Sequence, residues 1–231
     1  IGVWISGFFG SGKSHFLKML SYILENKQIG SSKTVDMFKD KLAASPKLYS
    51  LMKKATAVDT EAILFNIDIE GTSDKDSTAV MRVFAKMFYN HLGFFGENLK
   101  VARFEFYLYQ DGKTEEFRRV FKEKSGKEWT VGRRAFKLQA RYIVPTLMEV
   151  FGLEEEDAKK WFRDDEKYDF SIAALVDDIK YYIDTKPENF RLLFMIDEMG
   201  QYVGSDREHL LNLQSFLEKI GSSFGNRVWV M

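Results

Sequence analysis

The sequence contains no cysteine, which excludes disulfide bonds and thiolate metal sites and fits a reducing compartment. It also has no net charge, because 34 lysines and arginines balance 34 aspartates and glutamates. No overall field therefore draws the chain onto nucleic acid or a membrane. No apolar run approaches the length of a membrane-spanning helix. The length of 231 residues suits one or two domains, and we expect no membrane among the partners.

A glycine-rich motif near the beginning is the most informative feature that the sequence does contain. Residues 7–14, GFFGSGKS, match the phosphate-binding pattern G-x-x-x-x-G-K-[S/T], between a strand-like apolar run and an apolar helical pattern. Glycines let successive backbone N–H groups surround a phosphate, and the helix that follows adds its positive end. The motif therefore predicts a nucleotide site.

Two side chains of this motif have expected roles in chemistry. Lys13 should reach the β- and γ-phosphates, where it would also assist catalysis, and the Ser14 hydroxyl should coordinate Mg²⁺. His15 is more typical of packing or solvent exposure at the start of a helix. The residues predicted to bind the nucleotide are Gly7, Phe8, Phe9, Gly10, Ser11, Gly12, Lys13, Ser14 and His15.

Two segments could supply the acid on the Mg²⁺ side. Residues 192–198, LLFMIDE, form an apolar run that suits a buried parallel strand and end in adjacent carboxylates. Asp197 would orient the water shell of the metal, and Glu198 would act as the catalytic base that polarises the attacking water. Residues 68–71, DIEG, match the D-x-x-G element of GTPases, but no complete N/T-K-x-D guanine-reading element accompanies them. We therefore predict an ATPase, with a slowly hydrolysing nucleotide switch and a GTPase as alternatives.

Residues 3–22 and 194–202 together resemble the large P-loop protein of bacterial phage-exclusion (BREX) systems, the BrxC/PglY family. The resemblance implies a cytoplasmic ATPase that acts with a DNA methyltransferase and other defence components, and it leaves a homo-oligomer of the full-length protein open. The residues that match the nucleotide-site positions of that family are Lys13, Ser14, Asp197 and Glu198. Members of that family are several times longer, so we expect a fragment that binds ATP but hydrolyses it poorly.

The periodicity predicts an α/β fold, a three-layer P-loop core of the additional-strand, catalytic-glutamate (ASCE, AAA-like) class. Residues 1–231 would form this single core, truncated before its last strand. Parallel strands are expected at residues 2–5, 62–69, 192–196 and 227–231, in the spatial order 2-3-1-4. Helices are expected at residues 13–25, at 34–57 with a break near Pro46, and from a cap at Asp76 or Ser77 through Leu92.

The segment from residue 72 to 189 is too long for an ordinary connection between the second and third strands. We therefore predict that it is a mostly α-helical insertion within this core. Within it, residues 113–141 hold ten basic and four acidic residues, whereas 149–169 hold nine acidic and four basic ones. A DNA contact through Lys113–Arg141 would need the cations on one face, with Trp129 or Phe136 available for stacking. We favour the alternative, a solvated helical face that pairs with acidic neighbours.

Overall fold

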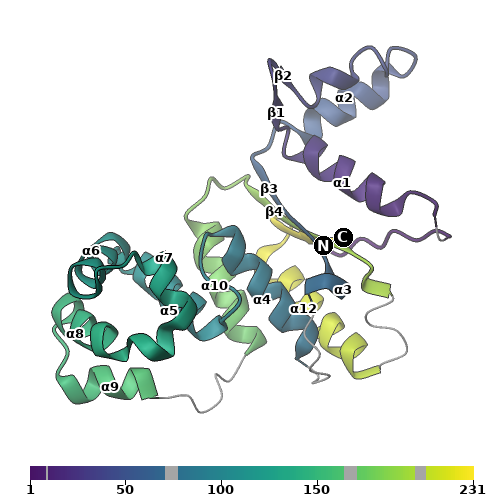
Figure 1. Cartoon of the computed structure of the whole chain (residues 1–231). Helices are drawn as coiled ribbons and strands as arrows, with labels where there is room; N and C mark the ends of the chain where they lie inside the picture. Colours follow the sequence, from purple (N-terminus) through teal and green to yellow (C-terminus); the bar gives the residue numbers. More distant parts are fainter. Residues whose placement is uncertain (9, 71–77, 164–170, 201–206) are drawn as a thin grey trace. The chain divides into compact units, whose positions relative to one another are not determined.

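The computed structural model describes the whole chain except residues 9, 71–77, 164–170 and 201–206 (Figure 1). The chain forms two compact units. Unit 1 comprises residues 1–83 and 171–231, and unit 2 comprises residues 84–170. Unit 2 lies within the stretch for which a helical insertion is expected.

Three parallel strands form the centre of unit 1. They are β3 (Thr60–Asn66), β4 (Arg191–Asp197) and β5 (Val228–Val230), in the spatial order β3-β4-β5. The register pairs Ile63 with Phe194, and Phe194 with Val230. All residues of β4 except its first and last are buried, which is typical of a parallel strand that is covered on both faces.

The segment that precedes the glycine-rich loop lies beside β5, and this position corrects the predicted strand order 2-3-1-4. Gly2 forms one parallel bridge with Val230, and the Val3 amide donates a hydrogen bond of 2.8 Å to the Val230 carbonyl. The observed order is therefore second, third, fourth, first. β5 takes the place beside β4 because Val228 and Val230 are buried there, whereas Gly2 and Val3 remain exposed.

Helices cover both faces of the sheet in unit 1, so this unit has three layers (Figure 1). Helix α1 (Lys13–Leu24) packs Leu17 against Leu193 and Met195 of β4. Because side chains alternate along a strand, Leu192, Phe194 and Ile196 face the opposite layer. That layer contains α10 (Ile172–Asp184) and α12 (Arg207–Phe224), and α12 contacts both α10 and β5.

A polar cluster ties α10 to the beginning of β3. The Tyr182 hydroxyl donates to Glu61 Oε2 (2.6 Å), and Lys186 Nζ donates to Glu61 Oε1 (2.8 Å). Burial, together with the hydrogen bond to Glu61, raises the pKa of Tyr182 to about 12. Burial opposes the charge of Lys186, but Glu61 and Tyr182 outweigh it and raise the pKa of this lysine.

The connection from α1 to β3 is less helical than predicted for residues 34–57, although a helix does begin at the expected break near Pro46. It contains the antiparallel pair β1 (Gln28–Ile29) and β2 (Ser32–Lys33), the 3₁₀ turn η1 (Asp36–Phe38) and helix α2 (Pro46–Ala55). Proline suits the first position of α2 because its missing N–H would have no helical partner there.

The second strand is also shorter at its end than predicted. β3 stops at Asn66, and the next residues form the short helix α3 (Ile67–Glu70). The Asn66 side chain accepts a hydrogen bond from the Asp68 amide (2.9 Å), which turns the chain out of the sheet. The predicted cap at Asp76 or Ser77 lies outside the described residues, and α4 (Ala79–His91) follows them.

Unit 2 is helical in the residues that the structure describes. After the end of α4, its helices are α5 (Leu99–Gln110), α6 (Thr114–Ser125), α7 (Trp129–Gly132), η2 (Arg133–Gln139), α8 (Ala140–Phe151) and α9 (Glu155–Arg163). Val101, Phe104 and Leu108 follow helical spacing along α5 and are buried in the core of this unit. Residues 103–109 are therefore part of a helix, although Phe104, Phe106 and Leu108 also alternate in the sequence as they would in a strand.

Candidate nucleotide site

The glycine-rich loop of unit 1 has the backbone conformation that a phosphate cradle requires. Gly10 and Gly12 have φ angles of +75° and +85°, in the left-handed region that glycine adopts without strain. Helix α1 begins at Lys13 and has no side-chain cap. Its first amides therefore remain available to an anion, and the helix dipole favours one there.

Lys13 lies folded over this loop. Its ammonium donates to the carbonyls of Gly7 (3.0 Å) and Phe8 (3.1 Å). Ser11 leaves little room at Gly7, where an added Cβ atom would lie 2.8 Å from Ser11 Oγ. A bound phosphate would replace two neutral acceptors of Lys13 with charged oxygens, which form stronger hydrogen bonds.

The two predicted acidic residues lie at the end of β4. Asp197 is the last residue of the strand, and its Oδ1 accepts a hydrogen bond from the Glu198 amide (3.1 Å). Glu198 has a φ angle of +61°, a conformation that costs a residue other than glycine about 1 kcal/mol. Backbone strain of this kind is typical of functional sites, where it fixes the direction of a side chain.

A cavity of about 590 Å³ in unit 1 joins the loop to the end of β4. Gly7 and Lys13 line it from the loop, and Asp197 and Glu198 line it from the strand. Its volume lies within the range of small-molecule sites. The other lining residues are mostly apolar and include Trp4, Ile5, Leu17, Ile196, Met199, Leu213, Leu217, Val230 and Met231.

The remaining predicted residues lie outside the lining of this cavity. Ser14 and His15 are exposed on the first turn of α1, and Phe8 is 92% exposed. Phe9 lies outside the described residues. Asp68, from the D-x-x-G alternative, is exposed on α3 and also lies outside the lining. Sequence reasoning missed the apolar wall of the cavity, because an apolar pattern by itself predicts only a core.

The donors present fit Mg²⁺ in the way that nucleotide sites use it. Mg²⁺ is usually held by one or two protein oxygens, with phosphate oxygens and waters as the other ligands. Ser14 and Asp197 offer a hydroxyl and a carboxylate of this kind. Among the residues that the structure describes, no group of three or more histidine, aspartate or glutamate side chains is placed to hold a metal ion.

Comparison with known families identifies the fold. Residues 1–222 match the KAP family P-loop domain. The chain belongs to this family. The match includes the glycine-rich loop, Asp197 and Glu198, and membership of the KAP family supports nucleotide binding. It does not confirm the more specific resemblance to the BrxC/PglY family. No solved structure matches the chain.

The KAP chain has no helix, within the described residues, that is long and apolar enough to cross a membrane. Its basic stretch at residues 113–141, in unit 2, is largely paired with carboxylates of the same unit. The pairs are Lys113–Glu116, Arg118–Glu115, Arg119–Glu123, Lys122–Glu128 and Lys124–Glu149, at 2.5 to 3.1 Å. These ion pairs agree with the favoured alternative of a paired helical face.

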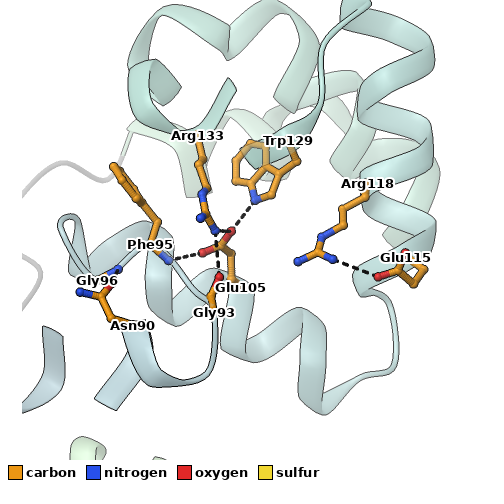
Figure 2. Close-up of polar contacts among 9 residues, drawn as sticks. All are labelled: Asn90, Gly93, Phe95, Gly96, Glu105, Glu115, Arg118, Trp129 and Arg133. Carbon is orange, nitrogen blue, oxygen red and sulfur yellow. Dashed lines mark hydrogen bonds and ion pairs between the residues drawn. The ribbon is translucent and has the colours of Figure 1, made fainter. Parts of the chain in front are cut away.

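Arg133 belongs to the interior of unit 2 and not to a basic surface. Figure 2 shows its guanidinium beside Glu105, which is buried and accepts hydrogen bonds from Arg133 (2.8 Å), Trp129 Nε1 (2.6 Å) and the Phe95 amide (2.6 Å). Trp129 and Phe136 are also buried, so neither is available for the stacking that a DNA contact would need. Among the described residues, the exposed cations of this stretch that lack an ion pair include Lys127, Arg134 and Arg141.

Proposed function

We propose that this KAP domain binds ATP with Mg²⁺ and hydrolyses it. The observation that supports the proposal best is the cavity lined by Lys13, at the start of α1, together with Asp197 and Glu198, at the end of β4. The D-x-x-G alternative places Asp68 outside that cavity, which favours ATP and a catalytic glutamate over a GTPase mechanism.

Each residue then has a defined task. Lys13 would leave the carbonyls of Gly7 and Phe8 and donate to the β- and γ-phosphate oxygens. Ser14 and Asp197 would hold Mg²⁺, which neutralises charge on the phosphate oxygens when it is bound. Glu198 would accept a hydrogen bond from the attacking water and take its proton. The strained backbone of Glu198 would keep that carboxylate directed at the water.

Two variants and one control test these tasks. Lys13→Ala should abolish Mg-ATP binding while far-UV circular dichroism stays unchanged, because the Lys13 ammonium donates its hydrogen bonds to carbonyls of the loop and not to the core. Glu198→Gln should bind ATP normally but lose roughly 10²- to 10⁴-fold in single-turnover hydrolysis. Asp68→Asn, which removes a carboxylate outside the cavity, should change neither. Equal ATP affinity in Lys13→Ala and wild type would remove the site assignment, and a larger loss of hydrolysis in Asp68→Asn would favour the GTPase alternative.

The cellular setting rests on the resemblance of residues 3–22 and 194–202 to the BrxC/PglY family. We propose that nucleotide state controls the assembly of a DNA-associated defence complex that includes a methyltransferase. Lys13→Ala in the protein that carries this domain should then remove protection against phage without lowering the amount of protein. Unchanged protection, alongside the loss of ATP binding, would leave the ATPase proposal intact and refute this setting.

A further inference from the structure

A second basic stretch, between β2 and the end of α2 in unit 1, differs from the paired stretch of unit 2. Residues 33–54 contain six lysines and two aspartates. All of them are described by the structure, and none of the six lysines forms an ion pair. We call them the lysine surface: Lys33, Lys39, Lys41, Lys47, Lys53 and Lys54. Two of them instead lie over aromatic rings, Lys41 over Phe38 and Lys53 over Tyr49.

Helix α2 carries three of these lysines, Lys47, Lys53 and Lys54, together with exposed apolar side chains. Leu48 and Leu51 are each 53% exposed, and no residue of α2 is fully buried. Tyr49 and Met52, on another face of the helix, are the more covered side chains. The exposed face therefore interleaves leucine with lysine, because Lys47, Leu51 and Lys54 follow helical spacing. Met37 and Ile29, outside α2, are also exposed, at 50% and 47%.

We propose that the lysine surface and the exposed leucines of α2 bind the surface of an anionic lipid bilayer. Clusters of four to eight cations on an amphipathic helix attract anionic headgroups, and the lysine stems can lie along apolar surface while their ammonium groups stay in water. Leu48 and Leu51 would enter the boundary between the headgroups and the acyl chains. This peripheral contact needs no spanning helix, and none of the described helices is long and apolar enough to be one.

Nucleic acid explains the same surface less well. Phosphates would attract the lysines, but they would make no apolar contact with the two exposed leucines. Arginine, the residue best suited to paired contacts with phosphate, is absent from residues 33–54. Tyr49, an aromatic side chain of α2, is partly covered and lies beneath Lys53. The combination of lysine with exposed leucine therefore favours lipid.

Sedimentation with vesicles tests the proposal on the whole chain. Vesicles of phosphatidylcholine with a minor share of phosphatidylglycerol should bind the chain at low salt, and pure phosphatidylcholine vesicles should bind it weakly. The triple variant Lys47→Gln/Lys53→Gln/Lys54→Gln should lower partitioning roughly 100-fold, since each cation near the surface contributes about fivefold. Leu48→Ala/Leu51→Ala should lower it roughly tenfold.

Unit 2 supplies a matched control for the loss of charge. Lys127→Gln/Arg134→Gln/Arg141→Gln removes the same three positive charges from another surface and should leave vesicle binding unchanged. Far-UV circular dichroism and Mg-ATP affinity establish that each variant is folded. An equal loss of vesicle binding in the control variant would overturn the proposal. So would a wild-type protein that does not bind anionic vesicles. Duplex DNA binding that depends on these lysines but not on the leucines, without vesicle binding, would assign the surface to nucleic acid instead.

Discussion

Replacing Glu105 with glutamine should destabilise unit 2 by about 3 kcal/mol although the side-chain volume hardly changes. Glu105 is 3% exposed, and its two oxygens accept three hydrogen bonds, one of them from the guanidinium of Arg133. Glutamine cannot compensate the charge of Arg133, whose side chain is only 15% exposed. The NH₂ group of the glutamine side chain would also face one of the three N–H donors, which would then lack an acceptor. Removing one partner of a buried ion pair typically costs about 3–5 kcal/mol.

Glu115→Gln is the matched control, because Figure 2 shows the same kind of contact between Glu115 and Arg118 at the surface. The Glu115 side chain is 84% exposed, so its loss should cost less than about 1 kcal/mol. Urea unfolding, followed by tryptophan fluorescence, measures both variants. With an m-value of about 2 kcal/mol/M, Glu105→Gln should lower the urea midpoint by about 1.5 M. A shift no larger than that of Glu115→Gln would refute the reasoning.

Three further predictions concern unit 1. Glu198→Gly should raise the free energy of unfolding by about 1 kcal/mol, because glycine relieves the positive φ, while single-turnover ATP hydrolysis is lost; a destabilised variant would show that the strain is not stored there. Tyr182→Phe should make the loss of stability between pH 10 and 12 shallower in urea titrations at several pH values. The raised pKa of Tyr182 means that its contribution is complete below pH 10 and disappears as the pH rises through about 12; an unchanged slope would contradict this. Lys13→Met should keep the melting temperature of the empty protein but remove the increase that Mg-ATP gives the wild type, and a retained increase would place the nucleotide elsewhere.

The elements nearest the site could be predicted because their signals are local. The GFFGSGKS motif and the apolar spacing of residues 16–24 predict α1, and the run LLFMIDE predicts β4 and its acidic end. The position of the P-loop segment beside β5 could not be predicted, because it depends on which distant strand buries more apolar surface. Isoleucines at 67 and 69 favour a strand, but the side chain of Asn66 ends β3 before them.

Ion pairs between residues close in the sequence could also be predicted, whereas pairs between distant residues could not. Arg118–Glu115 and Arg119–Glu123 lie three and four residues apart on α6, so their pairing follows from helical spacing in the sequence. Glu105 and Arg133 are separated by 28 residues, and only the packing of α5 against η2 brings them together. Counting charges by sign therefore overestimated the basic surface of residues 113–141 and overlooked the unpaired lysines of residues 33–54.

The hydrogen bonds of Lys13 to Gly7 and Phe8 affect the entropy of nucleotide binding. A free lysine side chain loses up to about 2 kcal/mol of rotamer entropy when it becomes fixed. Part of this loss occurs during folding, because two carbonyls hold the ammonium in the folded loop. An arriving phosphate therefore meets a localised charge that only has to exchange acceptors, and the P-loop is preorganised for the anion before the nucleotide arrives.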